Sequence, residues 1–132
     1  MIPVIDFNSE TVLDEIREAY TTVGFAVFTN TLNKQDQQTM HHWFDYMKQF
    51  FELDLDTKKK YSYQAENNLG YSVMGAENVD PTAPKDMKES FNYNNTRMPE
   101  ALWPEEVDLR TTGLETIRIA DDLTLRILAK FD

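Results

Sequence analysis

The chain has 132 residues, of which 41% are hydrophobic and 12% aromatic, so it can bury the core of one domain. Its 23 acidic residues outnumber 13 basic ones and give a formal net charge of -10, which argues against a nucleic-acid partner, because a phosphate-binding surface needs the opposite charge. The absence of cysteine excludes disulfides, thiolate catalysis and cysteine-ligated zinc.

The first part of the chain predicts a strand, a helix and a second strand. Residues 2–7, IPVIDF, are short, apolar and β-branched, as in an edge strand. After Asn8 or Ser9, either of which is a suitable N-cap, apolar residues recur with the period of a helix up to Gly24. Residues 25–28, FAVF, then predict a buried strand.

A central helix is predicted to begin after Asn33 and to end near Glu52. Large apolar residues recur in it at steps of three and four, which places them on one face. They are Met40, Trp43, Phe44, Met47, Phe50 and Phe51. Such a face must be covered, because each large side chain that leaves water contributes roughly 1.5–3 kcal/mol. We interpret this helix as the core of the fold rather than as a cofactor or partner groove.

The middle of the chain predicts a short helix and two short strands. The helix covers residues 56–61, with its first residue as the cap, and we interpret Lys58–Lys60 as its solvated C-terminal end. Strands are predicted over residues 70–74 and 89–93. Between them, residues 77–85 contain two prolines and predict a loop.

The last part predicts an irregular but packed segment over residues 98–104 and a helix over residues 109–131. The apolar face of this helix comprises Leu114, Ile117, Ala120, Leu123 or Thr124, Ile127, Leu128 and Phe131. Two ion-pair spacings lie on its outer side, Glu115 with Arg118 and Asp122 with Arg126. The sequence therefore predicts an α+β fold in which three main helices pack on a few short strands.

Composition and spacing alone predict no catalysis. His41 precedes Asp45 by four residues, as two metal ligands on one helix do, but no third ligand is apparent beside them or the adjacent His42. The acidic residues at positions 52–56 lack the glycine and the closing glutamate of a calcium loop. Residues 57–98 hold five acidic against six basic residues and are the only part suited to an anion.

The order of several segments along the chain indicates a family. IPVIDF, GFAVFTN, FFELDLDTKKKY, LGYS, DMKESFNYN and a Trp-Pro pair follow one another before the final helix. This order resembles the N-terminal region of the non-haem Fe(II), 2-oxoglutarate-dependent oxygenases of the isopenicillin N synthase-like family, over essentially all 132 residues. The chain departs from the family at two turns. Asn30–Leu32 replaces a frequent Asn-His-Gly, and Leu53–Asp54 replaces a frequent Leu-Pro.

The resemblance implies that a jelly roll normally follows, which carries a His-x-Asp…His iron triad and an Arg-x-Ser pair for 2-oxoglutarate. This chain contains neither His-x-Asp nor Arg-x-Ser. We therefore expect no catalytic or metal-ligating residue in it, and Fe(II) and 2-oxoglutarate only in a full-length enzyme. Some members of the branch do without 2-oxoglutarate. The implied partners are a C-terminal jelly-roll domain, on the same or a separate chain, and a small-molecule substrate.

In related enzymes the Gly-Tyr segment and the strand after it lie near the active-site mouth. Transferred to this sequence, the resemblance implies substrate-binding roles for Gly70, Tyr71, Ser72, Lys88, Glu89 and Ser90. Tyr71 would offer a phenol and a ring face, and Lys88 would meet an anionic substrate. The alternative is that Tyr71 packs in the core and Lys88 is solvated.

Three functions therefore stay open. The chain is the N-terminal part of an oxygenase that hydroxylates, desaturates or closes a ring, a non-catalytic binding or scaffold module, or one chain of a split enzyme. Because residues 1–132 form one domain that stops directly after a helix, we expect a fragment. Strands at Val4 and Val27 would then expose unpaired edges. No apolar run approaches the ~20 residues that span a bilayer, so we expect a soluble, cytoplasmic protein without a membrane partner.

Overall fold

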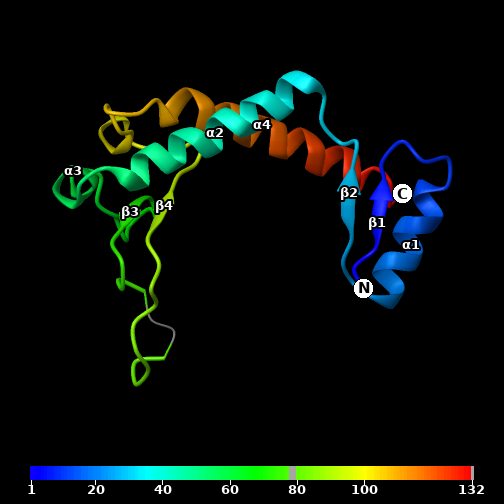
Figure 1. Ribbon diagram of the computed structural model, residues 1–132, viewed down its shortest axis with the longest axis horizontal. Coiled ribbons are helices and arrows are strands. Elements are labelled where there is room, and N and C mark those ends of the chain that lie inside the picture. Colours follow the sequence, from blue (N-terminus) through cyan, green and yellow to red (C-terminus); the bar gives the residue numbers. More distant parts are fainter. Residues whose placement is uncertain (78–79, 132) are drawn as a thin grey trace. The chain divides into compact units, whose positions relative to one another are not determined.

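The computed structural model describes residues 1–77 and 80–131 and has the predicted α+β fold, without a closed barrel among these residues (Figure 1). Its elements in chain order are β1 (Val4–Asp6), α1 (Val12–Thr22), β2 (Val27–Thr29), α2 (Lys34–Glu52), α3 (Leu55–Lys59), β3 (Gly70–Ser72), β4 (Ser90–Asn92), the 3-10 helix η1 (Glu100–Leu102) and α4 (Leu109–Leu128). Two residues of the predicted 77–85 loop, 78 and 79, lie outside the described residues, as does the chain end at Asp132.

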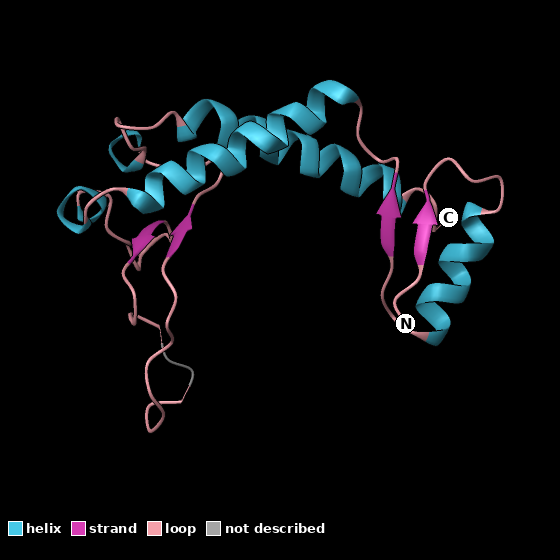
Figure 2. Cartoon of the chain, in the orientation of Figure 1, coloured by secondary structure: helices cyan, strands magenta, loops and turns pink. Residues whose placement is uncertain are grey.

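The chain divides into two compact units, to both of which α2 and α4 contribute. The strand unit comprises residues 1–38 and 118–132, and the hairpin unit comprises residues 39–117. The strands form two separate pairs, one in each unit (Figure 2).

In the strand unit, β1 and β2 pair in parallel, with Ile5 opposite Phe28 and Val4 opposite Val27. Ile5 is buried with the apolar face of α1, which comprises Val12, Ile16 and Ala19. Successive strand residues point to opposite faces of a sheet, so Val4 and Val27 share the other face. They are 65% and 49% exposed, and the prediction of a buried second strand is therefore wrong.

Both ends of α1 are fixed by local hydrogen bonds. The N-cap is Thr11 rather than the predicted Asn8 or Ser9. The hydroxyls of Ser9 and Thr11 each donate to the Glu15 carboxylate at 2.7 Å. At the other end Gly24 has a φ of +80° and donates its N–H to the Ala19 carbonyl at 2.9 Å, which confirms the predicted helix stop.

The core of the hairpin unit is largely aromatic. Its buried members are Trp43, Phe50, Tyr61, Tyr71, Phe91, Trp103, Val107 and Leu109. The predicted stripe of α2 contributes Trp43 and Phe50 fully, but Phe44 is 66% exposed. Phe44 lies about 100° around the helix from Trp43, on the flank away from the core, so its assignment to the buried face is wrong.

The predicted ends of α2 are confirmed, whereas α3, predicted over residues 56–61, covers Leu55–Lys59. The side-chain oxygen of Asn33 accepts the Asp36 N–H at 2.8 Å, and α2 ends at Glu52 as predicted. The cap of α3 is Asp54 rather than Asp56, because the Asp54 carboxylate accepts the Thr57 N–H at 3.0 Å.

The buried side of α4 differs from the predicted apolar face. Thr116 and Ile119 are buried, whereas Leu128 and Phe131 are more than half exposed and Ala120 is exposed. Gly113 lies against the Trp43 ring, where an added Cβ would come within 2.9 Å, so α4 approaches α2 closely at this turn. The predicted pair of Asp122 and Arg126 is confirmed, with 2.9 Å between carboxylate and guanidinium. No helix in the described part of the chain is long and apolar enough to cross a membrane.

Candidate functional site

The β3–β4 hairpin has two chemically different faces. The strands are antiparallel, with Tyr71 opposite Phe91 and Ser72 opposite Ser90. Tyr71 and Phe91 belong to the aromatic core, so Ser72 and Ser90 lie on the outer face. The hairpin therefore separates the predicted site residues into an inner group and an outer group.

Gly70 has a structural role that only glycine can fill. Its φ is +101°, and a Cβ atom there would lie 2.8 Å from the carbonyl oxygens of Tyr61 and Ser62. This close approach lets the Tyr71 N–H donate to the Tyr61 carbonyl at 2.7 Å and the Tyr63 N–H donate to the Tyr71 carbonyl at 2.8 Å. The segment after α3 is thereby joined to β3.

The outer group lines a polar groove of about 410 Å³. Its lining comprises Tyr63, Asn68, Ser72, Ala76, Glu77, Lys88, Ser90 and Asn92. The structure thus brings together three of the six predicted residues, Ser72, Lys88 and Ser90. The other lining residues were not predicted from the sequence; only Asn92 had a signal, because polar and apolar residues alternate from Ser90 to Tyr93.

Lys88 is paired rather than merely solvated. Its ammonium lies 2.6 Å from the Glu77 carboxylate, which also accepts the Ser90 hydroxyl at 3.2 Å. The hydrogen bond from Lys88 lowers the pKa of Glu77, and the same bond raises the pKa of Lys88. The Glu77 carbonyl also accepts the Asp86 N–H at 3.2 Å. Glu77 therefore links the segment that follows β3 to the segment that precedes β4.

The inner group forms a buried polar cluster that the sequence did not predict. The Lys58 ammonium lies 2.8 Å from the Glu89 carboxylate and 2.9 Å from the Phe51 carbonyl oxygen. The Tyr71 hydroxyl donates to the same Glu89 oxygen at 2.5 Å. Because the Lys58 side chain is only 9% exposed, its interpretation as part of a solvated helix end is wrong. Only Lys59 and Lys60 of the three lysines are exposed.

The pKa values of Tyr71 and Glu89 are shifted in opposite directions in this cluster. Burial, together with the hydrogen bond to Glu89, raises the pKa of Tyr71 far above its ordinary value. Burial also acts to raise the pKa of Glu89, but the hydrogen bonds from Lys58 and Tyr71 outweigh it and lower that pKa overall. The cluster therefore holds a neutral phenol between a carboxylate and the core. The predicted substrate roles of Tyr71 and Glu89 stay predictions.

A second hollow of about 430 Å³ adjoins the groove, because Asn68 and Asn92 line both. Its further lining comprises Asn67, Leu69, Phe91, Tyr93, Asn94 and Arg97. The Asn92 amide donates to the Asn68 side-chain oxygen at 3.3 Å, so the two residues that line both hollows are hydrogen-bonded to one another. The density of asparagine in residues 67–68 and 92–95 was the sequence signal for this part of the surface.

The described residues do not fit an iron ion. His41, His42 and Asp45 are exposed on α2. Across residues 1–77 and 80–131, no three histidine, cysteine, aspartate or glutamate side chains gather closely enough to hold a metal. A two-histidine, one-carboxylate centre therefore cannot be assembled from this part of the chain.

Comparison with known proteins gives one match. Residues 2–107 match the family model described as the N-terminal domain of the non-haem dioxygenase in morphine synthesis. No curated protein and no solved structure matches the chain. The matched residues include both strand pairs, α1 to α3 and the whole outer groove.

Proposed function

The chain belongs to the family of non-haem dioxygenase N-terminal domains, and we propose that it works as the N-terminal part of an Fe(II)/2-oxoglutarate-dependent oxygenase that acts on a small molecule. The match over residues 2–107 is the observation that carries this proposal. The proposed reactions are hydroxylation, desaturation or ring closure. In this enzyme the chain supplies a scaffold and one wall of the substrate pocket.

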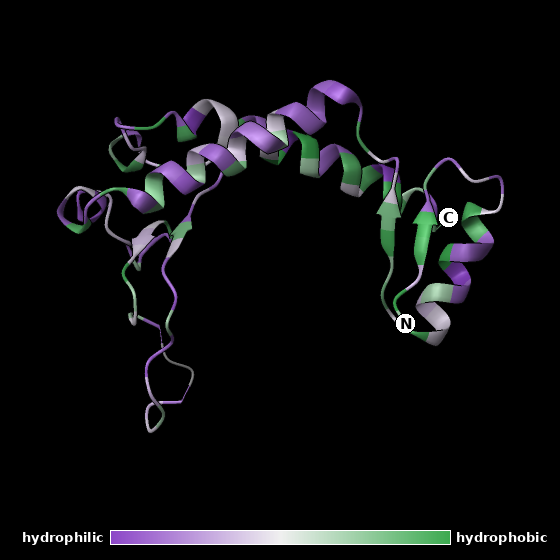
Figure 3. Cartoon of the chain, viewed as in Figure 1, coloured by the Kyte–Doolittle hydropathy of each residue, from purple (hydrophilic) through white to green (hydrophobic). Residues whose placement is uncertain are grey.

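We propose that a jelly-roll domain, on the same or a separate chain, holds the iron and 2-oxoglutarate. The exposed sheet of the strand unit supports such a partner. Val4 and Val27 are opposite one another in the strand pair and share its outer face, and Ile2 and Phe25 lie just before the two strands. All four are about half exposed or more, and β1 and β2 are strongly hydrophobic (Figure 3). An apolar sheet face of this kind marks an interaction surface.

The outer groove is the proposed substrate wall. It offers two serine hydroxyls, two asparagine amides and the Lys88–Glu77 ion pair. The opposite face of the hairpin packs in the aromatic core. Hydroxyl and amide groups orient a small polar substrate, whereas an iron centre elsewhere would supply the oxidising chemistry.

The test begins with the coding DNA past codon 132. We expect the reading frame, or a neighbouring gene, to encode a jelly roll with His-x-Asp, a distant histidine and Arg-x-Ser. The protein expressed from that DNA should release succinate from 2-oxoglutarate only when Fe(II) is added. A transcript that ends at codon 132, with no jelly-roll gene whose product binds the chain, would contradict the proposal.

The alternative is a non-catalytic binding module, and one observation favours it. The groove and its aromatic core both lie within the hairpin unit, so the unit does not need a partner to form them. A module of this kind would bind its ligand with unchanged affinity whether or not a jelly roll is present. An oxygenase wall would bind its substrate at least about tenfold more tightly in the complete enzyme.

A further inference from the structure

We propose that Arg97, together with the side-chain amides of Asn68 and Asn94, binds the carboxylate of an organic acid. These residues line the second hollow, beside the outer groove. This inference rests on the proposed function, because it takes the bound acid to be the substrate of the oxygenase. It names a substrate class, an acid with an apolar body.

The existing hydrogen bonds of the two asparagines leave donors for a ligand. The side-chain oxygen of Asn94 accepts the backbone N–H groups of Thr96 and Arg97 at 3.2 and 2.7 Å. The side-chain oxygen of Asn68 accepts from the Tyr63 hydroxyl at 3.0 Å and from the Asn92 amide at 3.3 Å. In both residues the oxygen is occupied, so the NH₂ group is the part that remains for a bound molecule.

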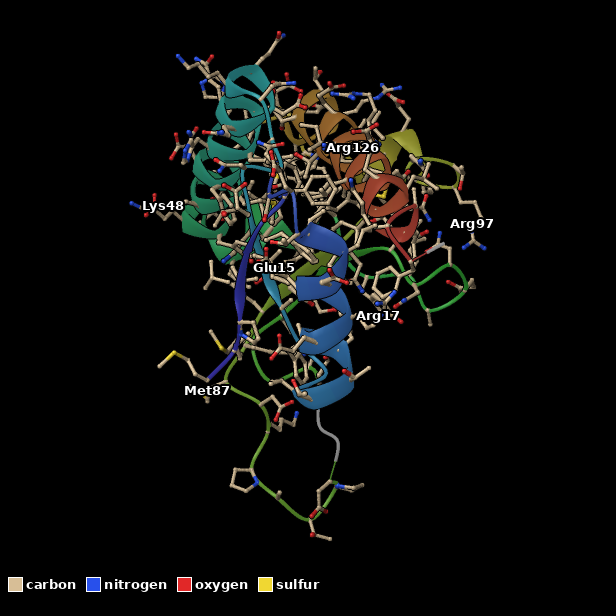
Figure 4. The ribbon with its side chains drawn as sticks, turned by 90° about the vertical axis from the view of Figure 1, so that its right-hand side faces the viewer. Glu15, Arg17, Lys48, Met87, Arg97 and Arg126 are labelled. Carbon is tan, nitrogen blue, oxygen red and sulfur yellow. The ribbon has the colours of Figure 1, made fainter. Side chains whose placement is uncertain are left out.

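Arg97 differs from the other arginines of the chain. Four arginines pair with carboxylates: Arg17 with Asp14, Arg110 with Glu100, Arg118 with Asp36, and Arg126 with Asp122. Within residues 1–77 and 80–131 the Arg97 guanidinium has no such pair, and its side chain extends away from the ribbon (Figure 4). An arginine fork binds a carboxylate through two parallel hydrogen bonds, which suits an acid better than a neutral molecule.

The floor of the hollow favours an acid with an apolar body. Leu69, Phe91 and Tyr93 line it beside the polar groups, and the Phe91 and Tyr93 rings lie 6.5 Å apart at 25°. Because Leu69 and Phe91 are buried, the partly exposed Tyr93 ring is the apolar surface on which a flat ligand can pack while its carboxylate reaches Arg97. The surrounding segment is also the least acidic part of an acidic chain, with five acidic against six basic residues between positions 57 and 98.

The experiment uses the 132-residue chain, uniformly labelled with ¹⁵N, and 3-phenylpropionate as the probe in an NMR titration. We expect the side-chain NH₂ signals of Asn68 and Asn94 and the Arg97 Nε–H signal to shift together. The matched neutral probe, 3-phenylpropionamide, should bind at least about tenfold more weakly, because it lacks the charge-assisted hydrogen bonds. Inorganic phosphate should compete more weakly than the acid, because it has no apolar body.

Three variants locate the site. Arg97→Gln should weaken binding of 3-phenylpropionate at least about tenfold, and Arg97→Lys should recover part of that loss. Lys48→Gln removes the same charge from an exposed pair with Glu52 on α2 and should change affinity less than about twofold (Figure 4). The dispersion of the amide spectrum shows whether each variant is folded.

Equal binding of the acid and the amide would overturn the inference, as would unchanged binding by a folded Arg97→Gln variant. Tighter binding of phosphate than of the acid, or shifts confined to residues outside the hollow, would also overturn it. None of these measurements uses iron, oxygen or 2-oxoglutarate. The NMR titration tests carboxylate binding, and succinate release tests the oxygenase proposal. Either proposal can therefore fail without the other.

Discussion

The Lys58 ammonium of α3 lies 2.8 Å from the Glu89 carboxylate, across 31 positions of the chain. The same carboxylate oxygen accepts the Tyr71 hydroxyl, and the Lys58 ammonium lies 5.4 Å from the centre of the Tyr71 ring. Two segments that are distant in sequence thus share one buried ion pair and one aromatic ring. This pair holds the hairpin in register with the end of α3.

Lys58→Met should lower the free energy of unfolding by about 2 kcal/mol, because it leaves the Glu89 carboxylate without its cation in a largely buried site. The loss is smaller than for a fully buried pair, since the Glu89 side chain remains 22% exposed. Urea unfolding followed by tryptophan fluorescence measures it. Lys59→Met, at the exposed neighbour, is the matched control and should change stability by less than about 0.5 kcal/mol. Equal losses in the two variants would contradict this account.

Glu89 should also make stability depend on acid pH. The pKa of this carboxyl is lowered below 4.5, since hydrogen bonds from Lys58 and Tyr71 outweigh the effect of burial. A carboxyl with a lowered folded-state pKa stabilises the fold above its unfolded-state pKa, and this stabilisation is lost as the pH falls through the folded-state value. Unfolding measured from pH 7 to pH 3 should therefore show a steeper loss below about pH 4.5 in the wild type than in Glu89→Gln. Parallel profiles would show that Glu89 does not contribute.

Gly70→Ala should destabilise the chain more than Gly24→Ala. Both glycines have positive φ, but an added Cβ at Gly70 would lie 2.8 Å from two carbonyl oxygens, whereas nothing lies within 4 Å of one at Gly24. The Gly24 variant measures the conformational cost alone, about 1 kcal/mol, and the Gly70 variant adds the clash, for a total of about 3 kcal/mol. Thermal unfolding of both variants gives the comparison. A Gly70 variant as stable as the Gly24 variant would mean that β3 can move away from the segment after α3.

The apolar sheet face should bind a hydrophobic dye in the native chain. Val4 and Val27 are directly opposite one another and are 65% and 49% exposed. Replacing both with threonine should reduce dye fluorescence at least about twofold while stability changes little, since neither side chain is in the core. Leu55→Thr removes a similarly exposed side chain from α3 and serves as the control. Absence of dye binding by the wild type would favour a self-sufficient module over an oxygenase part.

Sequence patterns predicted those features that depend on local chemistry. The α+β class, the cap at Asn33, the helix end at Glu52 and the helix stop at Gly24 all follow from residues close by in the chain. The predicted hairpin strands also exist, although each is shorter than expected. Local propensity and caps therefore determine the helix ends at Gly24, Asn33 and Glu52, but not the ends of the strands.

Features that depend on distant partners could not be predicted in this way. Three consecutive lysines look alike in the sequence, and only the folded position of Glu89 makes Lys58 a buried residue. Likewise, Phe44 matched the apolar period of α2, but the aromatic core lies against the side that carries Trp43 and Phe50. The sequence pattern predicted the two strands of the candidate site, and the resemblance implied substrate roles for residues in and beside them, which stay predictions. Neither indicated the asparagines that line the second hollow.

The bonds of Glu77 determine how the β3–β4 connection can change in length. The carbonyl and the carboxylate of Glu77 bond to Asp86, Lys88 and Ser90, so the two sides of the β3–β4 connection are joined close to the strands. Lengthening such a closed connection costs little, about 0.6 kcal/mol for each doubling of its length. Residues inserted at the tip around Pro81 and Pro84 should therefore leave the register of the hairpin unchanged.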